Sequence, residues 1–434
     1  MLIKKLKALG AGLATGLTTG LTIVLLTGCT TVSLDEPQRL CAPGGANTSP
    51  RSGDYACPEY APPPAPAYVP PPREVESAPV QTAPIQLPGH ESPNPPPAAA
   101  RGAGPVRVAL LLPMNSPSLG AAADAVRAGF MASAERDGAG IAVDLVATGD
   151  SADDALAAYS RAAASHDVIV GPLARPAVSA LASGGGAVSL PTVALNHPEV
   201  RGSLPRGMVV AGLSIENEAR QAADWAAREH PQGRVLILTG NAAWAQRAAG
   251  AFEARWSELG HTGQRYNLPS VGGRVDPLAI SELKTRLEID PPEVLFAALD
   301  VIELRQVRAQ TGTAIPLYTG GAGNPGRAPG TAYAELNGLR VVDLPWLIRP
   351  DNPAVMVYPR PIDSEQSLTM SRLYALGIDA FLVARELGLR PGSPFIIDGV
   401  TGHLEVDAGS QRLRRREAMA VYRDGNFEPA DAGP

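Results

Sequence analysis

The chain has 434 residues, of which 45% are hydrophobic and 18% charged, and its formal net charge at pH 7 is −6. This length leaves room for one tail and one two-lobed folded domain. An acidic chain is a poor non-specific ligand for nucleic acid, so no nucleic acid is expected among its partners.

The first 28 residues have the parts of a bacterial secretory signal. Three lysines lie within the first seven residues, and residues 8–26 form an uncharged, apolar stretch. This stretch is rich in Gly and Thr, which makes it a poor membrane-spanning helix, although an uncleaved membrane helix is the alternative. It ends in Leu-Thr-Gly-Cys, which matches the lipobox of bacterial lipoproteins. We therefore expect a signal peptide over residues 1–28 and lipidation of Cys29.

Residues 29–104 are expected to form a lipidated, proline-rich and disordered tether. Three Pro-Pro-Pro runs within it exclude helix and central strand and favour polyproline II. About 75 such residues reach at most roughly 230 Å, so the tether would let a folded domain leave the membrane surface. The same composition would also suit a tail with no role, or a docking site for a polyproline-binding partner.

Two further cysteines, Cys41 and Cys57, lie in this tether. Outside the cytoplasm they could form a disulfide, and two free thiols are the alternative. A metal site is less favoured, because no histidine lies near them. Thr30 stands where an inner-membrane retention signal would place Asp. By similarity to the sorting rules of enteric bacteria, this favours the outer membrane, with the protein facing the periplasm.

Beyond residue 105 short apolar runs alternate with helical patterns. The runs predict strands at residues 106–112, 141–147, 167–170, 192–195, 234–238, 294–297, 316–318, 395–398, 403–406 and 418–422. Helices are predicted at residues 119–136, from 150, at 216–229, from about 242 to 259, at 301–311 and around 373–387.

The recurrence of this strand–helix unit predicts an α/β fold with two doubly wound lobes and parallel sheets. We expect the folded domain over residues 105–428. The first lobe would take about residues 105–212 with C-terminal segments, and the second about residues 213–335. Residues 429–434 would be a tail.

In such sheets ligands bind beyond the carboxyl ends of the strands, between the lobes. That rule selects seven candidates for an inter-lobe cleft: Asn115, Ser116, Gly171, Pro172, Leu173, Asn196 and Asn241. The alternative is that these residues are turn and cap residues, since Asn, Ser, Gly and Pro dominate turns for backbone reasons.

Catalytic patterns are weak in this sequence. Ser281 and Lys284 have the S-x-x-K spacing of serine acyltransferases, but no K-T-G or Ser-Asp-Asn element accompanies them. The histidines form no metal-ligand motif, so neither a metal nor a cofactor is expected. A basic cluster at Arg412, Arg414, Arg415 and Arg416 is a candidate contact for an anionic partner, or a solvated face.

An ordered set of short motifs resembles the penicillin-binding-protein activators of the LpoA/LppC type. The motifs begin with VALLLP at 108–113 and VRAGF at 126–130, and continue with GPL at 171–173, ALN at 194–196 and GLS at 212–214. The last two, LGIDA at 376–380 and GVTGHL at 399–404, resemble C-terminal signatures of that family.

The resemblance implies a type I periplasmic-binding-protein fold and a lipoprotein of the outer membrane. It also implies activation of a bifunctional penicillin-binding protein, a peptidoglycan synthase, by direct periplasmic contact and without enzymatic activity. Well-known members carry a helical repeat domain where this chain has its proline-rich tether, so the chain resembles a short form. The alternative is a periplasmic receptor for a small, amino-acid-like molecule, which would occupy the cleft.

Replacing the lipidation candidate, Cys29→Ala, should abolish both membrane attachment and incorporation of labelled palmitate, because the acceptor thiol is lost. Cell fractionation and palmitate labelling measure the two effects. Cys41→Ala is the matched control and should leave both unchanged. Continued labelling of the Cys29→Ala variant would contradict the expected lipidation site.

Overall fold

The computed structural model describes residues 104–184, 188–199, 202–328, 332–361 and 367–430. By its internal contacts the chain divides into two units, residues 1–93 and 94–434, and every described element belongs to the second. The expected signal peptide, Cys29, Cys41, Cys57 and the tether lie outside the described residues.

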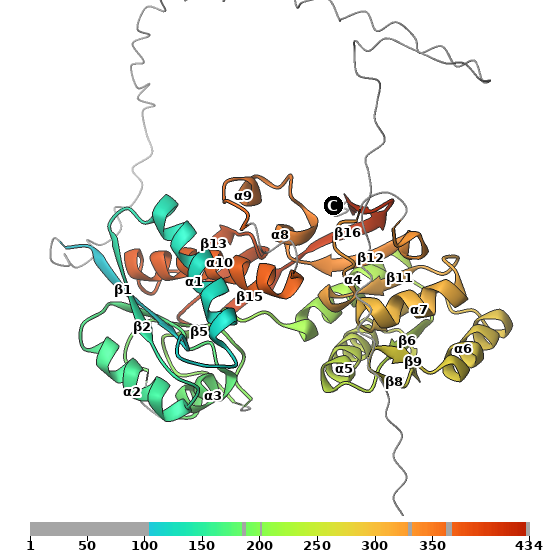
Figure 1. The fold of residues 1–434 in the computed structure, drawn as a ribbon, viewed down its shortest axis with the longest axis horizontal. Helices are drawn as coiled ribbons and strands as arrows, with labels where there is room; N and C mark the ends of the chain where they lie inside the picture. Colours follow the sequence, from blue (N-terminus) through green and yellow to red (C-terminus); the bar gives the residue numbers. More distant parts are fainter. Residues whose placement is uncertain (1–103, 185–187, 200–201, 329–331, 362–366, 431–434) are drawn as a thin grey trace, which may run out of the picture. The chain divides into compact units, whose positions relative to one another are not determined.

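The first lobe is built on a five-stranded parallel sheet in the order β2-β1-β3-β4-β5 (Figure 1). Its strands are β1 (Val106–Leu112), β2 (Ile141–Ala147), β3 (Val168–Val170), β4 (Thr192–Ala194) and β5 (Met208–Val210). The helices between them are α1 (Gly120–Asp137), α2 (Ala152–Ala163) and α3 (Arg175–Ser183).

The second lobe is built on a seven-stranded sheet in the order β17-β16-β12-β11-β10-β6-β7. Its strands are β6 (Val235–Thr239), β7 (Gly263–Asn267), β10 (Val294–Ala298), β11 (Leu317–Thr319), β12 (Leu339–Asp343), β16 (Ala418–Arg423) and β17 (Asn426–Pro429). Its helices are α4 (Ile215–Glu229), α5 (Ala243–Glu258), α6 (Pro277–Ile289) and α7 (Val301–Thr311). The sheet extends past the boundary expected near residue 335, because β16 returns and pairs antiparallel with β12.

The remaining elements connect or cover these sheets. A hairpin joins β8 (Ser270–Val271) to β9 (Arg274–Val275), and β13 (Phe395–Asp398), β14 (His403–Asp407) and β15 (Arg412–Arg416) form a third, antiparallel sheet. The other helices are α8 (Pro345–Ile348), α9 (Pro353–Met356) and the long α10 (Leu368–Leu389), with single 3-10 turns η1 (Gly321–Gly323) and η2 (Ala334–Leu336).

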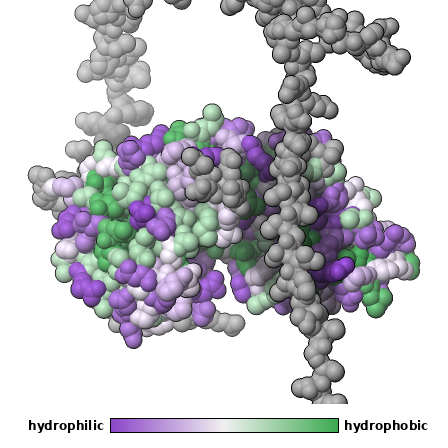
Figure 2. Space-filling model, viewed as in Figure 1, coloured by the Kyte–Doolittle hydropathy of each residue, from purple (hydrophilic) through white to green (hydrophobic). Residues whose placement is uncertain are grey.

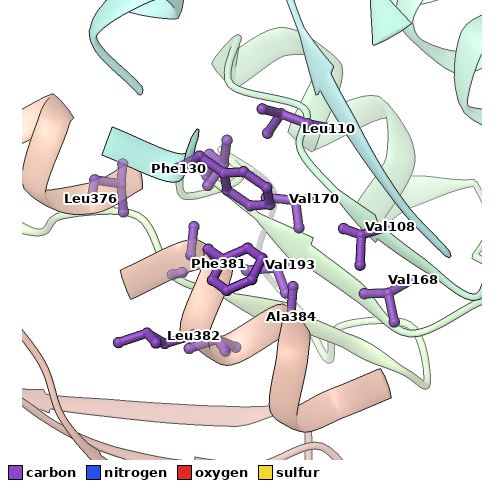
Figure 3. Close-up of a cluster of buried hydrophobic side chains, with 14 of the residues drawn as sticks. Val108, Leu110, Phe130, Val168, Val170, Val193, Leu376, Phe381, Leu382 and Ala384 are labelled. Atoms are coloured by element: carbon purple, nitrogen blue, oxygen red, sulfur yellow. The ribbon is translucent and has the colours of Figure 1, made fainter. Parts of the chain in front are cut away.

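The core of the first lobe contains residues that lie far apart in the sequence. Side chains of β1, β3, β4 and α1 pack against α10, which comes some 170 residues after β4 (Figure 3). The rings of Phe130 and Phe381 meet edge to face, with centroids 5.2 Å apart. Both side chains are fully buried, so α10 completes the first lobe.

Two glycines allow α1 and α10 to approach at backbone distance. A Cβ atom at Gly129 would collide with the carbonyl oxygen of Tyr374, and one at Gly377 would collide with that of Val126. Any larger residue at either position must therefore push the helices apart. This close approach explains why glycine stands in both motifs.

The predicted α/β class with two lobes is confirmed: the first sheet is parallel throughout, and the second is parallel except for β16 and β17, which pair antiparallel at one edge. The predicted helix over residues 301–311 has the observed bounds of α7, and the predicted strand over residues 141–147 those of β2. The pattern missed α3, β5, β7, β12, β15 and β17, and the short elements α8, α9, β8 and β9. Most of these are short or half-exposed and carry little periodic signal.

The surface is mixed in polarity. On the face shown in Figure 2, hydrophilic and hydrophobic residues are interspersed, as is usual for folded domains. Among the residues that the structure describes, no helix combines the length and apolarity needed to cross a bilayer.

The substitution Gly377→Ala should lower the free energy of unfolding by about 1–3 kcal/mol, because the new methyl group overpacks the contact with α1. Gly250→Ala in α5 is the matched control. It meets only the side chain of Arg265 and should raise stability by about 0.5–1 kcal/mol through helix propensity. Denaturant unfolding measures both. Equal effects of the two substitutions would refute the close approach.

Candidate functional site

A cleft of about 710 Å³ is lined by residues of both lobes and of β15. The first lobe contributes Arg175 at the start of α3 and the segment from His197 to Glu199 after β4. The segment that joins β5 to α4 crosses the cleft. The complete lining is Arg175, His197, Pro198, Glu199, Val210, Gly212, Leu213, Ser214, Ile215, Glu216, Asn217, Arg220, Trp244, Arg247, Leu413 and Arg415.

One wall of the cleft is held by a buried guanidinium. Arg415 is 7% exposed and donates to the carbonyl oxygens of Gly212 (2.9 Å) and Ala211 (2.5 Å). Its Nε donates to the hydroxyl of Thr401 at 3.0 Å. Burial lowers the pKa of Arg415, whereas the nearby charges of Glu417 and Asp379 raise it. These contacts fix β15 against the end of β5.

A buried carboxylate supports the other side of Thr401. Asp379 of α10 accepts hydrogen bonds from the backbone N–H of Val400 (2.9 Å) and of Thr401 (2.7 Å), and from the Thr401 hydroxyl (2.5 Å). Burial raises the pKa of Asp379, and these hydrogen bonds oppose the rise. The loop between β13 and β14 is thereby attached to α10 through one side chain.

A second buried charge cluster connects α10 to the second lobe. Arg372 of α10 donates to both carboxylate oxygens of Asp343 and to the carbonyl of Gly321 (2.7 Å). Glu218 of α4 accepts from the backbone N–H of Gly321 at 2.7 Å. Burial raises the pKa of Glu218 to about 8, and the charge of Asp343 contributes to the rise. Helix α10 therefore packs in the first lobe and forms an ion pair with the second.

Among the described residues that line the cleft, Arg247 forms an ion pair with Glu216, with a distance of 2.8 Å from Nε to Oε1. Ser214 caps α4 and donates to the other oxygen of Glu216 at 3.1 Å. Burial opposes ionisation of Glu216, but Arg247 and Ser214 hold its pKa below the ordinary value. Glu216 is therefore an ionised and partnered carboxylate.

His197 shares an acceptor with Arg415. Its Nε2 lies 3.0 Å from the carbonyl oxygen of Gly212, to which it donates. Burial lowers the pKa of His197, and the positive charges of Arg415 and Arg175 lower it further. The imidazole is therefore neutral near pH 7, with Nδ1 as an acceptor.

None of the seven residues expected in the cleft belongs to its lining. Gly171, Pro172 and Leu173 are buried, and the Asn196 amide donates to the Leu173 carbonyl at 3.1 Å. The Ser116 hydroxyl accepts from the N–H of Leu119 at the start of α1 (2.8 Å).

The remaining two, Asn115 and Asn241, are exposed, and Asn241 accepts from the side chain of Asn267 at 3.1 Å. The residues that do line the cleft, such as Arg175, His197 and Trp244, stand one to three positions further along the chain. Selecting residues three to five positions beyond the ends of β3, β4 and β6 would have found them.

Strand alternation separates the four clustered arginines. Arg412, Arg414 and Arg416 are exposed, and Glu405 lies 3.9 Å from Arg414 and 3.6 Å from Arg416. The side chain of Arg415 points to the opposite face of the strand and is buried. The prediction that Arg415 contacts a partner is therefore wrong, because its guanidinium binds groups inside the domain.

The S-x-x-K pair lies on α6, where Ser281 and Lys284 are both exposed. A surface helix is thus the observed context of that pair. Within the described ranges, no group of three or more His, Cys, Asp or Glu side chains is placed to hold a metal ion.

Replacing the buried guanidinium, Arg415→Met, should lower the free energy of unfolding by about 3–5 kcal/mol, because two carbonyls and the Thr401 hydroxyl lose their donor. Arg414→Met removes the neighbouring, exposed guanidinium and should change stability little. Denaturant unfolding of the two variants measures the difference. If both variants unfold at the same denaturant concentration, the internal role of Arg415 is wrong.

Stability should also fall as the pH rises from about 5 to 8. Folded Glu218 retains its proton up to a pKa of about 8, whereas its ordinary pKa is 4.5. Between these values the folded state binds more protons than the unfolded state, so increasing pH favours unfolding, by on the order of a few kcal/mol.

Glu218→Gln should flatten this slope, because the amide cannot ionise. A residual slope of the same sign remains from Glu417, whose pKa burial raises to about 7. Glu216→Gln is the control and should leave the slope unchanged, because the pKa of Glu216 is lowered. Urea titrations at several pH values measure the slopes, and an unchanged slope in Glu218→Gln would contradict the assignment.

Comparison with known proteins gives the family. A family described as "LppC putative lipoprotein" matches residues 101–272 and 284–425. The penicillin-binding protein activator LpoA of Photobacterium profundum is 26% identical over an alignment of 298 residues, and the match covers 60% of this chain and 46% of that relative. The chain thus spans about half the length of the curated relatives it matches.

Solved structures share the fold. The C-domain of LpoA from Haemophilus influenzae, a regulator of PBP1A, superposes with a TM-score of 0.60 at 22% identity. The match covers 75% of this chain and 99% of that domain. A "putative branched-chain amino acid ABC transporter" from Chromobacterium violaceum superposes with a TM-score of 0.61 at 30% identity, over 73% of this chain and all of that one. Since the family match covers most of the described domain, the chain belongs to the LppC lipoprotein family.

Proposed function

We propose that this protein is an outer-membrane lipoprotein that activates a bifunctional penicillin-binding protein by direct contact in the periplasm. In this proposal residues 1–28 are a signal peptide, Cys29 carries the lipid anchor and residues 29–104 are the tether. The domain from about residue 105 makes the contact and acts without catalysing a reaction. No nucleic acid and no cofactor take part.

The observation that carries the proposal is the family match over the folded domain, together with relatives that are penicillin-binding protein activators. The matched segment of the LpoA relatives corresponds to less than half of their length. The domain shared with this chain has the fold of the LpoA C-domain. The activating contact is therefore assigned to this domain.

Physical features of the chain agree with such a contact. A proline-rich tether of about 75 residues supplies reach of roughly 230 Å at most, so a domain anchored on one membrane could meet a partner on the other. On the domain, Arg412, Arg414 and Arg416 present exposed guanidiniums along β15. Charged surface groups of this kind speed encounter and fix the register of a complex.

A receptor for a small molecule is the second candidate. It is favoured by the cleft of about 710 Å³ and by the similarity to the Chromobacterium violaceum protein. This candidate needs no contact with a synthase, which distinguishes it from the first.

The test uses the full chain, purified in detergent, with bifunctional penicillin-binding proteins of the same cell and lipid II as substrate. We expect binding and a several-fold higher rate of glycan polymerisation or cross-linking. Arg412→Gln with Arg414→Gln should slow association, because steering charge is lost. Arg161→Gln with Arg274→Gln removes two exposed arginines, on α2 and β9, and is the charge-matched control.

Unchanged synthase rates, together with no measurable binding to any of these enzymes, would reject the activator function. Equal association rates for the β15 double variant and for the control double variant would retain activation but remove β15 from the contact.

A further inference from the structure

The cleft is positively charged in a chain that is acidic overall. Four guanidiniums line it, those of Arg175, Arg220, Arg247 and Arg415, against the two carboxylates of Glu199 and Glu216. The whole chain has a formal charge of −6. A concave surface with this local excess attracts anions, because its walls exclude the solvent that would screen the charge.

The guanidiniums of Arg175 and Arg220 have N–H donors available for a ligand, and those of Arg247 and Arg415 are engaged within the protein. Arg247 is paired with Glu216, and Arg415 donates to carbonyl and hydroxyl oxygens. Arg175 and Arg220 are exposed and form no ion pair within the described part of the chain. Since they come from α3 and α4, an anion between them would bridge the first lobe and the second.

An apolar surface lies in the same cleft. Trp244 of α5 is partly exposed there, and Leu213, Ile215 and Leu413 also line the cleft. The other three tryptophans of the chain, Trp225, Trp256 and Trp346, are at most 3% exposed. Trp244 is therefore the tryptophan whose ring can contact a bound molecule.

We propose that this cleft binds a small organic anion, with its acidic group between Arg175 and Arg220 and its apolar part against Trp244. A guanidinium donates two parallel hydrogen bonds to a carboxylate or a phosphate, and both acids fit the same pair of arginines. The volume of the cleft is in the range of small-molecule sites. The site does not depend on contact with a synthase, so it can exist whether or not the activator function holds.

A net anion fits better than a zwitterionic amino acid. The lining holds four guanidiniums and two carboxylates, so its net charge favours an anion over a molecule with no net charge. Of the two carboxylates, Glu216 is already engaged by Arg247 and Ser214, which leaves Glu199 as the one lining carboxylate without an ion pair among the described residues.

The experiment follows the fluorescence of the full chain in detergent while four probes are added. 3-Phenylpropanoate carries a carboxylate, phenyl phosphate a phosphate, L-phenylalanine a carboxylate with an ammonium, and 3-phenylpropanol no charge. We expect saturable quenching by at least one of the two anions and none by the alcohol. The tighter of the two anions identifies the acid. Trp244→Phe should remove the signal.

Arg175→Gln and Arg220→Gln should each weaken binding of that anion roughly tenfold, since each removes charge-assisted hydrogen bonds. Arg274→Gln on β9 makes the same change in net charge outside the cleft and should leave affinity unchanged. All three are exposed, and circular dichroism verifies their folding.

Three outcomes would overturn the proposal. The first is binding of L-phenylalanine more tightly than 3-phenylpropanoate, which would indicate an amino-acid site. The second is equal quenching by the alcohol and the anions. The third is equal loss of affinity in Arg175→Gln and Arg274→Gln. Titration with purified synthase is a separate measurement, so failure of this site leaves the activator function standing.

Discussion

The arrangement of the cleft depends on one buried guanidinium. Arg415 donates to the carbonyls of Ala211 and Gly212, at the point where the chain leaves the first sheet, and to Thr401. A charge removed from water is tolerated only when such partners surround it. The crossing segment and β15 therefore hold one another in place. His197 donates to the same Gly212 carbonyl oxygen as Arg415. One backbone acceptor thus connects two residues that line the cleft.

Short motifs of the family lie at contacts between distant parts of the chain. Gly129 and Gly377 let α1 and α10 meet at backbone distance. Two residues after Gly377, Asp379 accepts from the backbone of Val400 and Thr401, and Thr401 in turn accepts from Arg415.

One face of strand β15 lines the cleft, and the other face is exposed. Its side chains alternate, so Leu413 and Arg415 line the cleft while Arg412, Arg414 and Arg416 are exposed. The proposed synthase contacts the exposed arginines, and the proposed anion binds in the cleft. A ligand and a partner protein would thus lie on opposite faces of the same strand. Lobe closure around a ligand is a known motion of two-lobed folds. The buried contacts of Arg372 and Arg415 are the groups that such a motion would have to keep or break.

The sequence by itself determined the fold class, the two lobes, most parallel strands and the family, because buried strands and helix faces leave periodic apolar patterns. It also predicted a cleft between the lobes, but the seven residues it selected do not line the cleft. Only the tertiary structure decided which residues line that cleft. The reason is that the direction of each side chain depends on how the backbone turns in the loop after each strand. The tertiary structure alone also showed that α10 packs in the core of the first lobe, that β16 joins the second sheet and that the Arg415 side chain is buried. Those placements rest on contacts between residues some 75 to 250 positions apart, for which local patterns carry no signal.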